Sequence, residues 1–118
     1  MAEDSTCTVR DLRESVSQFV CERSWKKFHD PKNLAESIVL EASELLEFFQ
    51  WLTTEEAKDL GRDKEKVREV SEELADVVIY CLSMANELEI DVSSSVLQKI
   101  EKNKKKYPIG KFYGKARE

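Results

Sequence analysis

The sequence predicts an all-α fold, and three observations point to it. Charged residues make up 36% of the 118 positions, whereas glycine and proline together occupy only five. Apolar residues recur at intervals of three and four over long stretches, which is the helical period. Long helices joined by few turns account for these features better than a sheet does. A chain of this length builds one modest core, so we expect a single domain.

The first helix is expected to begin at Val9. Thr8 is a favourable N-cap, and Asp11 lies in the first turn, where a carboxylate complements the helix dipole. The apolar period continues to about residue 25 or 28. Pro31 then marks a break, because proline disfavours helical backbone at the preceding residue and suits a helix start. The only histidine, His29, falls in this break and is interpreted as a loop residue rather than a base.

The second helix is predicted from about Lys32 to Leu52. Its apolar residues cover about half of the circumference, more than one partner helix needs. We therefore expect burial on two sides, in a bundle that also packs against another subunit. The apolar positions are Leu34, Ile38, Val39, Ala42, Leu45, Leu46, Phe48 and Phe49.

Two further helices are expected. After a cap at Thr53 and a short acidic turn that ends near Gly61, a long helix is predicted over residues 64 to 88 or 89. Asp91 can cap the last helix, which begins at Val92 and continues into the lysine run until Pro108 stops it.

Three segments follow from these assignments. Residues 1–7 are predicted to be a flexible N-terminus, residues 8–108 the domain, and residues 109–118 a tail without helical period.

The organising feature of the chain is a pair of acidic couples, Glu41 with Glu44 and Glu73 with Asp76. At about 100° per residue, Glu41 falls inside the apolar arc of its helix and Glu44 lies at its edge. Glu73, Asp76 and Tyr80 follow one flank of the apolar stripe on the later helix. Two helices that face each other would place four carboxylates between them.

Four carboxylates that close repel one another and require protons or cations. Oxygen-only ligands suit Mg²⁺, with Mn²⁺ as a substitute, and the absence of histidine or cysteine at these positions argues against zinc. The alternative is that either acidic couple is a solvated helix surface, since 24 of the 118 residues are acidic.

Net charge is −5, and residues 99–118 carry eight Lys/Arg against two Glu. An acidic body with a basic end is unlike a protein that binds polymeric nucleic acid, and it suits a small polyanion held between metal and lysines. Three scattered cysteines are expected to be reduced thiols. No apolar run is long enough for a membrane span, so a soluble, cytoplasmic protein is predicted.

The residues around the acids are similar to those of a known group. The series runs Glu22-Arg23-Ser24-Trp25, Phe28-His29-x-Pro31-x-Asn33-Leu34, Glu41-x-x-Glu44-Leu45, Phe49-Gln50-Trp51, Glu73-x-x-Asp76-Val77-x-Ile79-Tyr80 and Lys102-Asn103-x-x-x-Tyr107-Pro108. Over residues 8 to 108 it resembles the MazG-like all-α nucleoside triphosphate pyrophosphohydrolases, and within them the dCTP pyrophosphatase subgroup.

The resemblance implies a four-helix bundle-like subunit of the MazG type that assembles into a homotetramer. It implies Mg²⁺-dependent hydrolysis of a nucleoside triphosphate, dCTP or a modified dCTP, to the monophosphate and pyrophosphate. The four metal-binding acids of the family carry over to Glu41, Glu44, Glu73 and Asp76. Val16 stands where animal members have a histidine, which affects the substrate contacts on that helix.

The resemblance also implies substrate-binding residues. The base pocket carries over to Trp25 and Trp51, with Tyr80 near the sugar or base. The phosphate side carries over to Lys102, Asn103 and Tyr107, while Lys99 and Lys106 are candidates by position only. Each tryptophan taken singly is as compatible with a core role, and the lysines also complement the negative end of their helix.

Two other functions remain open. One is a less base-selective or dUTP-type pyrophosphohydrolase, because the sequence does not place the hydrogen bonds that distinguish bases. The other is a non-catalytic helical oligomerisation module whose acids keep it in solution. Glu41 is the acid that points furthest inward and is a candidate proton acceptor, although any of the four acids could serve.

Overall fold

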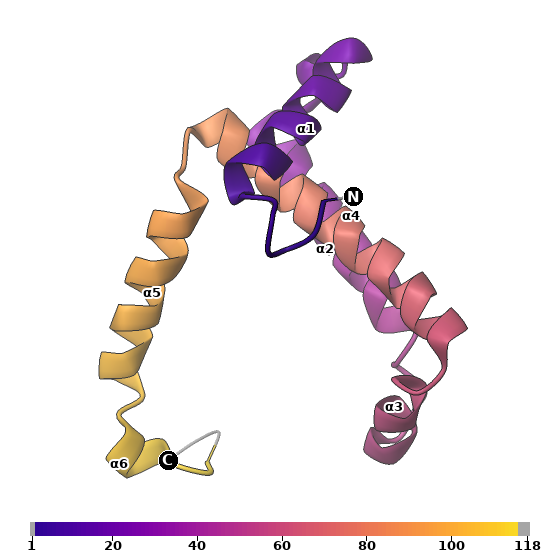
Figure 1. The fold of residues 1–118 in the computed structure, drawn as a ribbon, viewed down its shortest axis with the longest axis vertical. Helices are drawn as coiled ribbons and strands as arrows, with labels where there is room; N and C mark the ends of the chain where they lie inside the picture. Colours follow the sequence, from indigo (N-terminus) through magenta and orange to yellow (C-terminus); the bar gives the residue numbers. More distant parts are fainter. Residues whose placement is uncertain (1, 116–118) are drawn as a thin grey trace.

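The computed structural model describes residues 2–115, which form helices joined by short turns (Figure 1). No β-strand occurs among these residues, so the predicted all-α class is confirmed. No helix in the same range is both long and apolar enough to cross a membrane. The elements are α1 (Val9–Glu22), the 3₁₀ helix η1 (Lys26–Phe28), α2 (Pro31–Glu47), α3 (Thr54–Leu60), α4 (Lys64–Leu88), α5 (Val92–Lys106) and α6 (Ile109–Phe112).

Local side-chain caps decide where the first helix begins. The backbone amide of Asp11 donates to the Thr8 hydroxyl at 3.1 Å, and the amide of Thr8 donates to the Asp11 carboxylate at 3.0 Å. This reciprocal capping box confirms the predicted start of α1. The helix ends earlier than predicted, at Glu22, because Ser24 has a φ of 53°, in the left-handed region that a right-handed helix excludes.

The second helix also ends before its predicted end at Leu52. Asp30 caps its start, since the amide of Asn33 donates to the Asp30 carboxylate at 2.9 Å. At the other end, Thr53 and Glu56 form the capping box of α3, with bonds of 3.0 and 3.1 Å. The chain therefore has to leave α2 and turn over residues 48–52.

The C-terminal segment contains one element that its sequence pattern does not predict. α6 is a single turn inside the predicted tail, and the rings of Tyr107 and Phe112 pack edge to face with centroids 5.2 Å apart. A helix of four residues is too short to show apolar periodicity. The last part of the predicted tail, residues 116–118, lies outside the described residues.

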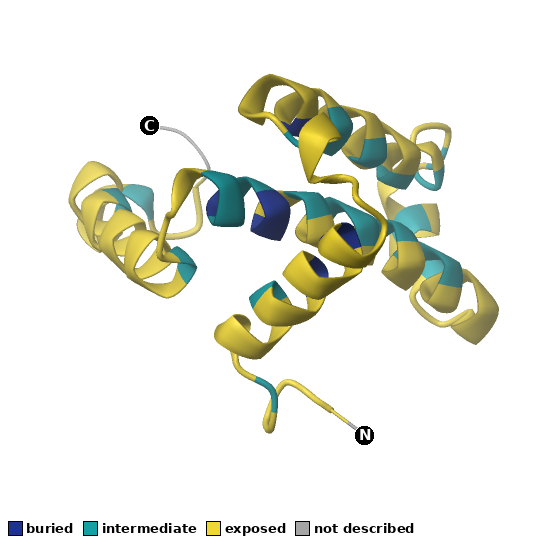
Figure 2. Cartoon of the chain, turned by 90° about the horizontal axis from the view of Figure 1, so that it is seen from above, coloured by how far each residue is buried: buried dark blue, intermediate teal, exposed yellow. Residues whose placement is uncertain are grey.

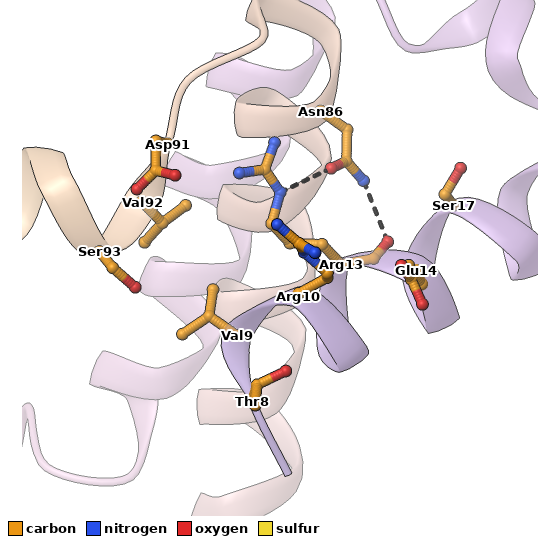
Figure 3. A pocket seen from close by; sticks show the side chains of 10 residues that line it. All are labelled: Thr8, Val9, Arg10, Arg13, Glu14, Ser17, Asn86, Asp91, Val92 and Ser93. Atoms are coloured by element: carbon orange, nitrogen blue, oxygen red, sulfur yellow. Dashed lines mark hydrogen bonds between the residues drawn. The ribbon is translucent and has the colours of Figure 1, made fainter.

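The long helix α4 is the centre of the chain. α2 packs along it and α1 crosses it, and these are the helix pairs with extensive contact among residues 2–115 (Figure 1). The crossing of α1 is held by polar groups: Arg13 Nε donates to Asn86 Oδ1 at 2.9 Å, and Asn86 Nδ2 donates to the Arg13 carbonyl at 3.2 Å (Figure 3). Arg13 also donates to the Ile90 carbonyl, just after α4, at 2.6 Å.

Replacing Arg13 by alanine is expected to lower the free energy of unfolding by about 1–3 kcal/mol, because its hydrogen bonds carry a charged donor and Asn86 loses its partner. Urea unfolding at a fixed protein concentration measures the change. Arg10→Ala is the matched control, since the Arg10 side chain is exposed and makes no hydrogen bond or ion pair within the described residues. Equal losses in the two variants would contradict a stabilising role of the Arg13 hydrogen bonds between α1 and α4.

The hydrophobic core of the single chain is small. Val16, Val20, Leu34, Leu82 and Ala85 are its buried apolar residues, and Figure 2 shows how few positions are dark blue. So thin a core leaves a chain of this length poorly stabilised as a monomer. Large apolar side chains remain exposed instead, which in soluble proteins marks contact surfaces.

Two of these exposed surfaces bear on the predicted assembly. On α2, Val39 and Leu46 of the predicted apolar arc are 64% and 57% exposed, whereas Leu34 of the same arc is 1% exposed. The second half of the wide apolar arc therefore has no partner within the described chain. α5 diverges from the other helices (Figure 1), and its Leu97 is 64% exposed. Within one chain, α5 does not close a four-helix bundle with α1, α2 and α4.

Candidate functional site

The acidic couples lie together because α2 and α4 run side by side. Glu41 on α2 and Glu73 and Asp76 on α4 each present an oxygen, and these atoms all lie within 4.8 Å of one another. All three side chains are half-buried. This arrangement arises because Glu41 points toward α4, and because Glu73 and Asp76, three residues apart, lie on the same side of α4.

Glu44 completes the acidic group from a more exposed position. Its carboxyl interacts with those of both Glu41 and Glu73. With Glu47, Phe48 and Glu73 it lines a surface hollow of about 310 Å³. Phe48 belongs to the apolar arc that was predicted to contain Glu41. Sequence reasoning missed Glu47 as a neighbour of the acids, although its spacing of three from Glu44 places it on the same side of the helix.

The acids change one another's proton affinity. Partial burial, reinforced by the carboxyls of Glu44, Asp76 and Glu73, raises the pKa of Glu41 from 4.5 to about 7. Hydrogen bonding with Glu44, followed by desolvation, raises the pKa of Glu73. Like charges held this close favour the protonated form unless a cation neutralises them.

Two carboxylate oxygens of the cluster are buried without a hydrogen-bond partner among the described residues. These atoms, Oε2 of Glu41 and Oε2 of Glu73, are inaccessible to solvent. No lysine or arginine in residues 2–115 forms an ion pair with any of the four acids. A set of hard oxygen donors with unsatisfied lone pairs fits a divalent cation such as Mg²⁺ or Mn²⁺. Glu41, Glu73 and Asp76 are the residues that could hold it.

Without metal, the protein is expected to lose stability as the pH rises. Because the pKa of Glu41 is raised from 4.5 to about 7, the folded state binds this proton more tightly than the unfolded chain does. The stabilisation is fully present below pH 4.5 and is lost as the pH rises through about 7. With an allowance for solvent screening, the loss is on the order of 1 kcal/mol, or a few degrees in Tm.

Thermal unfolding in a chelator at several pH values between 5 and 8, followed by circular dichroism, measures how Tm changes with pH. Glu41→Gln is expected to reduce the fall of Tm with rising pH, and added Mg²⁺ should raise Tm most at pH 8. Glu36→Gln is the matched control, since Glu36 is exposed on the same helix. If Glu41→Gln leaves the pH dependence of Tm unchanged, groups other than Glu41 cause it.

Tyr80 and His29 continue the site beyond the acids. Tyr80 lies one turn after Asp76 on α4, and its ring centroid is 6.3 Å from that of His29. His29 follows η1 in the chain break, as predicted, and is half-buried. Trp25 immediately precedes η1, where its ring packs edge to face on Phe19 with centroids 5.6 Å apart.

The two tryptophans do not meet within one chain. Trp25 precedes α2 and Trp51 follows it, and a helix of 17 residues is about 25 Å long. Two rings that stack on one base have to lie far closer than this. Trp51 is also 87% exposed. Its assignment to the base pocket therefore stays a prediction that requires a second copy of the chain.

The predicted phosphate-side residues also lie apart from the acids. Lys102, Asn103 and Tyr107 belong to the diverging end of α5, which has no extensive packing on α2 or α4 (Figure 1). Asn103 accepts the backbone bond of Tyr107 at 2.8 Å. Lys99 and Lys106 lie on the same helix, and the ammonium of Lys106 stands 5.4 Å from the centre of the Tyr107 ring. The structure does not bring these residues to the acids of their own chain.

A larger polar pocket lies elsewhere. It measures about 580 Å³ and occupies the space between the start of α1 and the junction of α4 with α5 (Figure 3). None of the predicted site residues lines it. The acidic cluster is therefore the part of the chain whose geometry fits the predicted chemistry.

Comparison with known proteins identifies the family of this chain. The sequence model of the MazG-like family matches residues 36–118, a range that includes all four acids. The chain belongs to the MazG-like family. Among solved structures, this MazG-like chain is similar to a pyrophosphatase from Archaeoglobus fulgidus, with a TM-score of 0.75 and 44% identity over 84% of this chain and 91% of that one.

Mammalian proteins are also similar to this MazG-like chain. dCTP pyrophosphatase 1 from Homo sapiens is 38% identical over 101 residues, which is 86% of this chain and 59% of the human protein. dCTP pyrophosphatase 1 from Bos taurus is 35% identical over 109 residues, 92% of this chain and 64% of the bovine protein. The chain thus spans about six-tenths of the length of these relatives.

Proposed function

We propose that this MazG-like protein hydrolyses a nucleoside triphosphate to the monophosphate and pyrophosphate, with dCTP or a modified dCTP as substrate and Mg²⁺ as cofactor. The observation that carries the proposal is the cluster of Glu41, Glu73 and Asp76, whose oxygens lie within 4.8 Å of one another. The relatives named above, which are dCTP pyrophosphatases and a pyrophosphatase, support the reaction and the substrate.

The chain's own residues supply the binding and proton-transfer parts of this reaction. Glu41, Glu44, Glu73 and Asp76 would hold the cation, which when bound neutralises phosphate charge and lowers the pKa of water. Glu41 is the proposed proton acceptor, because it is the acid that points furthest inward from its helix and therefore lies closest to where the reacting water would be held. The oxygen of water bonds to the α-phosphorus, the bond from that phosphorus to the bridging oxygen breaks, and pyrophosphate leaves.

The proposal includes assembly of several copies, with a tetramer as the expected state. The exposed apolar residues of α2 and α5 supply the contact surfaces, and a neighbouring α5 can complete the four-helix bundle that one chain leaves open. A second copy of the chain would also complete the base pocket, with Trp25 and Tyr80 from one chain and Trp51 from another. The basic segment with Lys102, Asn103 and Tyr107 approaches the triphosphate in the same way. Because nucleoside triphosphates are intracellular metabolites, the proposal retains a cytoplasmic location.

The proposed reaction predicts a defined product pattern. With Mg²⁺, dCTP and its 5-modified analogues are expected to yield dCMP-type products and pyrophosphate in equal amounts, with kcat/KM exceeding those of dUTP and dTTP. Chromatography of the nucleotides together with separate assays for pyrophosphate and orthophosphate measures this. A preference for dUTP, or equal rates on all bases, would replace the proposed substrate with a dUTP-type or less selective one. Release of orthophosphate would contradict attack at the α-phosphorus.

A further inference from the structure

A small polar cavity adjoins the acidic site, enclosed by α1, η1 and α4. Its volume is about 110 Å³. Val16 and Val20 form its apolar side, while Lys26, His29, Ser83 and Glu87 contribute polar groups. His29 also lies beside the Tyr80 ring, with the two ring centroids 6.3 Å apart, and Tyr80 is one helical turn from Asp76.

Ser83 makes this cavity unusual. Its side chain is 3% exposed, and its hydroxyl has no hydrogen-bond partner among the described residues. A buried hydroxyl without a partner is unfavourable, and alanine at the same position would avoid the cost. The other serine that α4 carries within residues 64–88, Ser71, is exposed and its hydroxyl donates to the Arg68 carbonyl at 2.7 Å. Ser83 is therefore placed to bond with something that enters the cavity.

The position of Ser83 on α4 relates it to the metal-binding acids. Asp76, Tyr80 and Ser83 are spaced by four and three residues, so they share one face of the helix. The rise from Asp76 to Ser83 is about 10 Å. This matches the length of the sugar and base that separate an α-phosphate from the far edge of a pyrimidine. A nucleotide with its phosphates at the acids and its sugar beside Tyr80 would direct its base into the cavity.

The size and chemistry of the cavity suit the edge of a base rather than a whole ring. A cavity of about 150 Å³ accommodates benzene, so a cavity of about 110 Å³ is too small to enclose a base and can receive only its outer edge. A hydroxyl both donates and accepts, and Lys26 and Glu87 add a donor and an acceptor. We propose that this cavity receives the polar edge of a pyrimidine base and that Ser83 is a specificity-determining residue that bonds to it. This inference rests on the proposed function.

Equilibrium binding tests the inference without requiring turnover. Calorimetric titration with dCMP, dUMP, dAMP and deoxyribose 5-phosphate would be carried out on the wild type, Ser83→Ala and the control Ser71→Ala. Ser83→Ala is expected to weaken binding of the preferred pyrimidine monophosphate about tenfold, the effect of losing one hydrogen bond. Binding of deoxyribose 5-phosphate should be unchanged, and Tm should be equal to or higher than that of the wild type.

The results separate this inference from the proposed reaction. A pyrimidine-specific loss in Ser83→Ala supports the cavity assignment even if the wild type releases no pyrophosphate, in which case the proposed function alone fails. In an active enzyme the same variant should raise KM for the preferred substrate and leave kcat within twofold. Equal affinities in the wild type and Ser83→Ala, equal weakening for deoxyribose 5-phosphate, or no measurable binding of any pyrimidine monophosphate would overturn the inference.

Discussion

Replacing Glu73 by glutamine is expected to reduce Mg²⁺-dependent pyrophosphate release by two to three orders of magnitude while the helical fold is retained. Glutamine keeps the volume of the side chain but removes the charge that a cation requires. Loss of one ligand costs several kcal/mol of transition-state stabilisation, and each 1.36 kcal/mol corresponds to a factor of ten in rate. The Glu73 carboxyl is one of three whose oxygens lie within 4.8 Å of one another.

The same substitution should not harm the fold. In the absence of metal, hydrogen bonding with Glu44, desolvation and the charges of Glu44 and Asp76 raise the pKa of Glu73, so its charged form is unfavourable there and removal of the charge relieves repulsion. We therefore expect Tm in a chelator to be equal to or higher than that of the wild type. Glu72→Gln is the matched control, because Glu72 is the exposed neighbour on α4, and it should keep full activity.

Three measurements on the wild type, Glu73→Gln and Glu72→Gln decide between an enzyme and a helical oligomerisation module. They are pyrophosphate release, Tm and Mg²⁺ affinity. The module predicts that Glu73→Gln and Glu72→Gln behave alike in all three measurements. If Glu73→Gln retains the rate of the wild type, the acidic cluster is not the reaction centre.

Mixing two impaired tryptophan variants is expected to restore part of the wild-type activity. Trp25→Ala and Trp51→Ala should each lower kcat/KM about 10- to 100-fold, since a base stacked on an aromatic ring gains about 1–3 kcal/mol. Trp25 and Trp51 flank opposite ends of α2, which has 17 residues, so we expect each substrate site to take one ring from each of two chains. A pair of chains related by two-fold symmetry then has two such sites.

In a random mixture, about a quarter of the sites combine an intact Trp25 with an intact Trp51. Unfolding the two variants together and refolding them should therefore recover up to about a quarter of the wild-type activity, whereas each variant refolded alone stays low. Sedimentation velocity on the same samples establishes that they assemble. No recovery in assembled mixtures would contradict a site shared between chains.

Local sequence signals predicted much of the fold. The capping box of Thr8 with Asp11 placed the start of α1, because both partners lie within one turn and need no tertiary contact. The start of α4 at Lys64 was likewise predicted correctly. The ends of α1 and α2 were predicted too late, because a positive φ at Ser24 and the capping box of the next helix terminate them, and apolar periodicity registers neither.

Part of the candidate site was likewise predictable from the sequence, and part was not. The angular position of the acids around their two helices was enough to predict that Glu41 would lie with Glu73 and Asp76. Both acidic couples are on or beside the apolar side of an amphipathic helix, and the two helices pack through these sides. The partnerless hydroxyl of Ser83 gave a weaker signal: its spacing from Tyr80 places it on the face of the acids, but burial is a property of the folded chain.

The sequence by itself determined the helical class, the caps and the inward direction of the acids, since each depends on residues within a few turns of one another. Only the tertiary structure decided the distances between helices. It showed that α5 leaves the other helices and that Trp25 and Trp51 lie at opposite ends of α2. Helical periodicity specifies which side of a helix is apolar, but it does not specify whether the partner for that side belongs to the same chain.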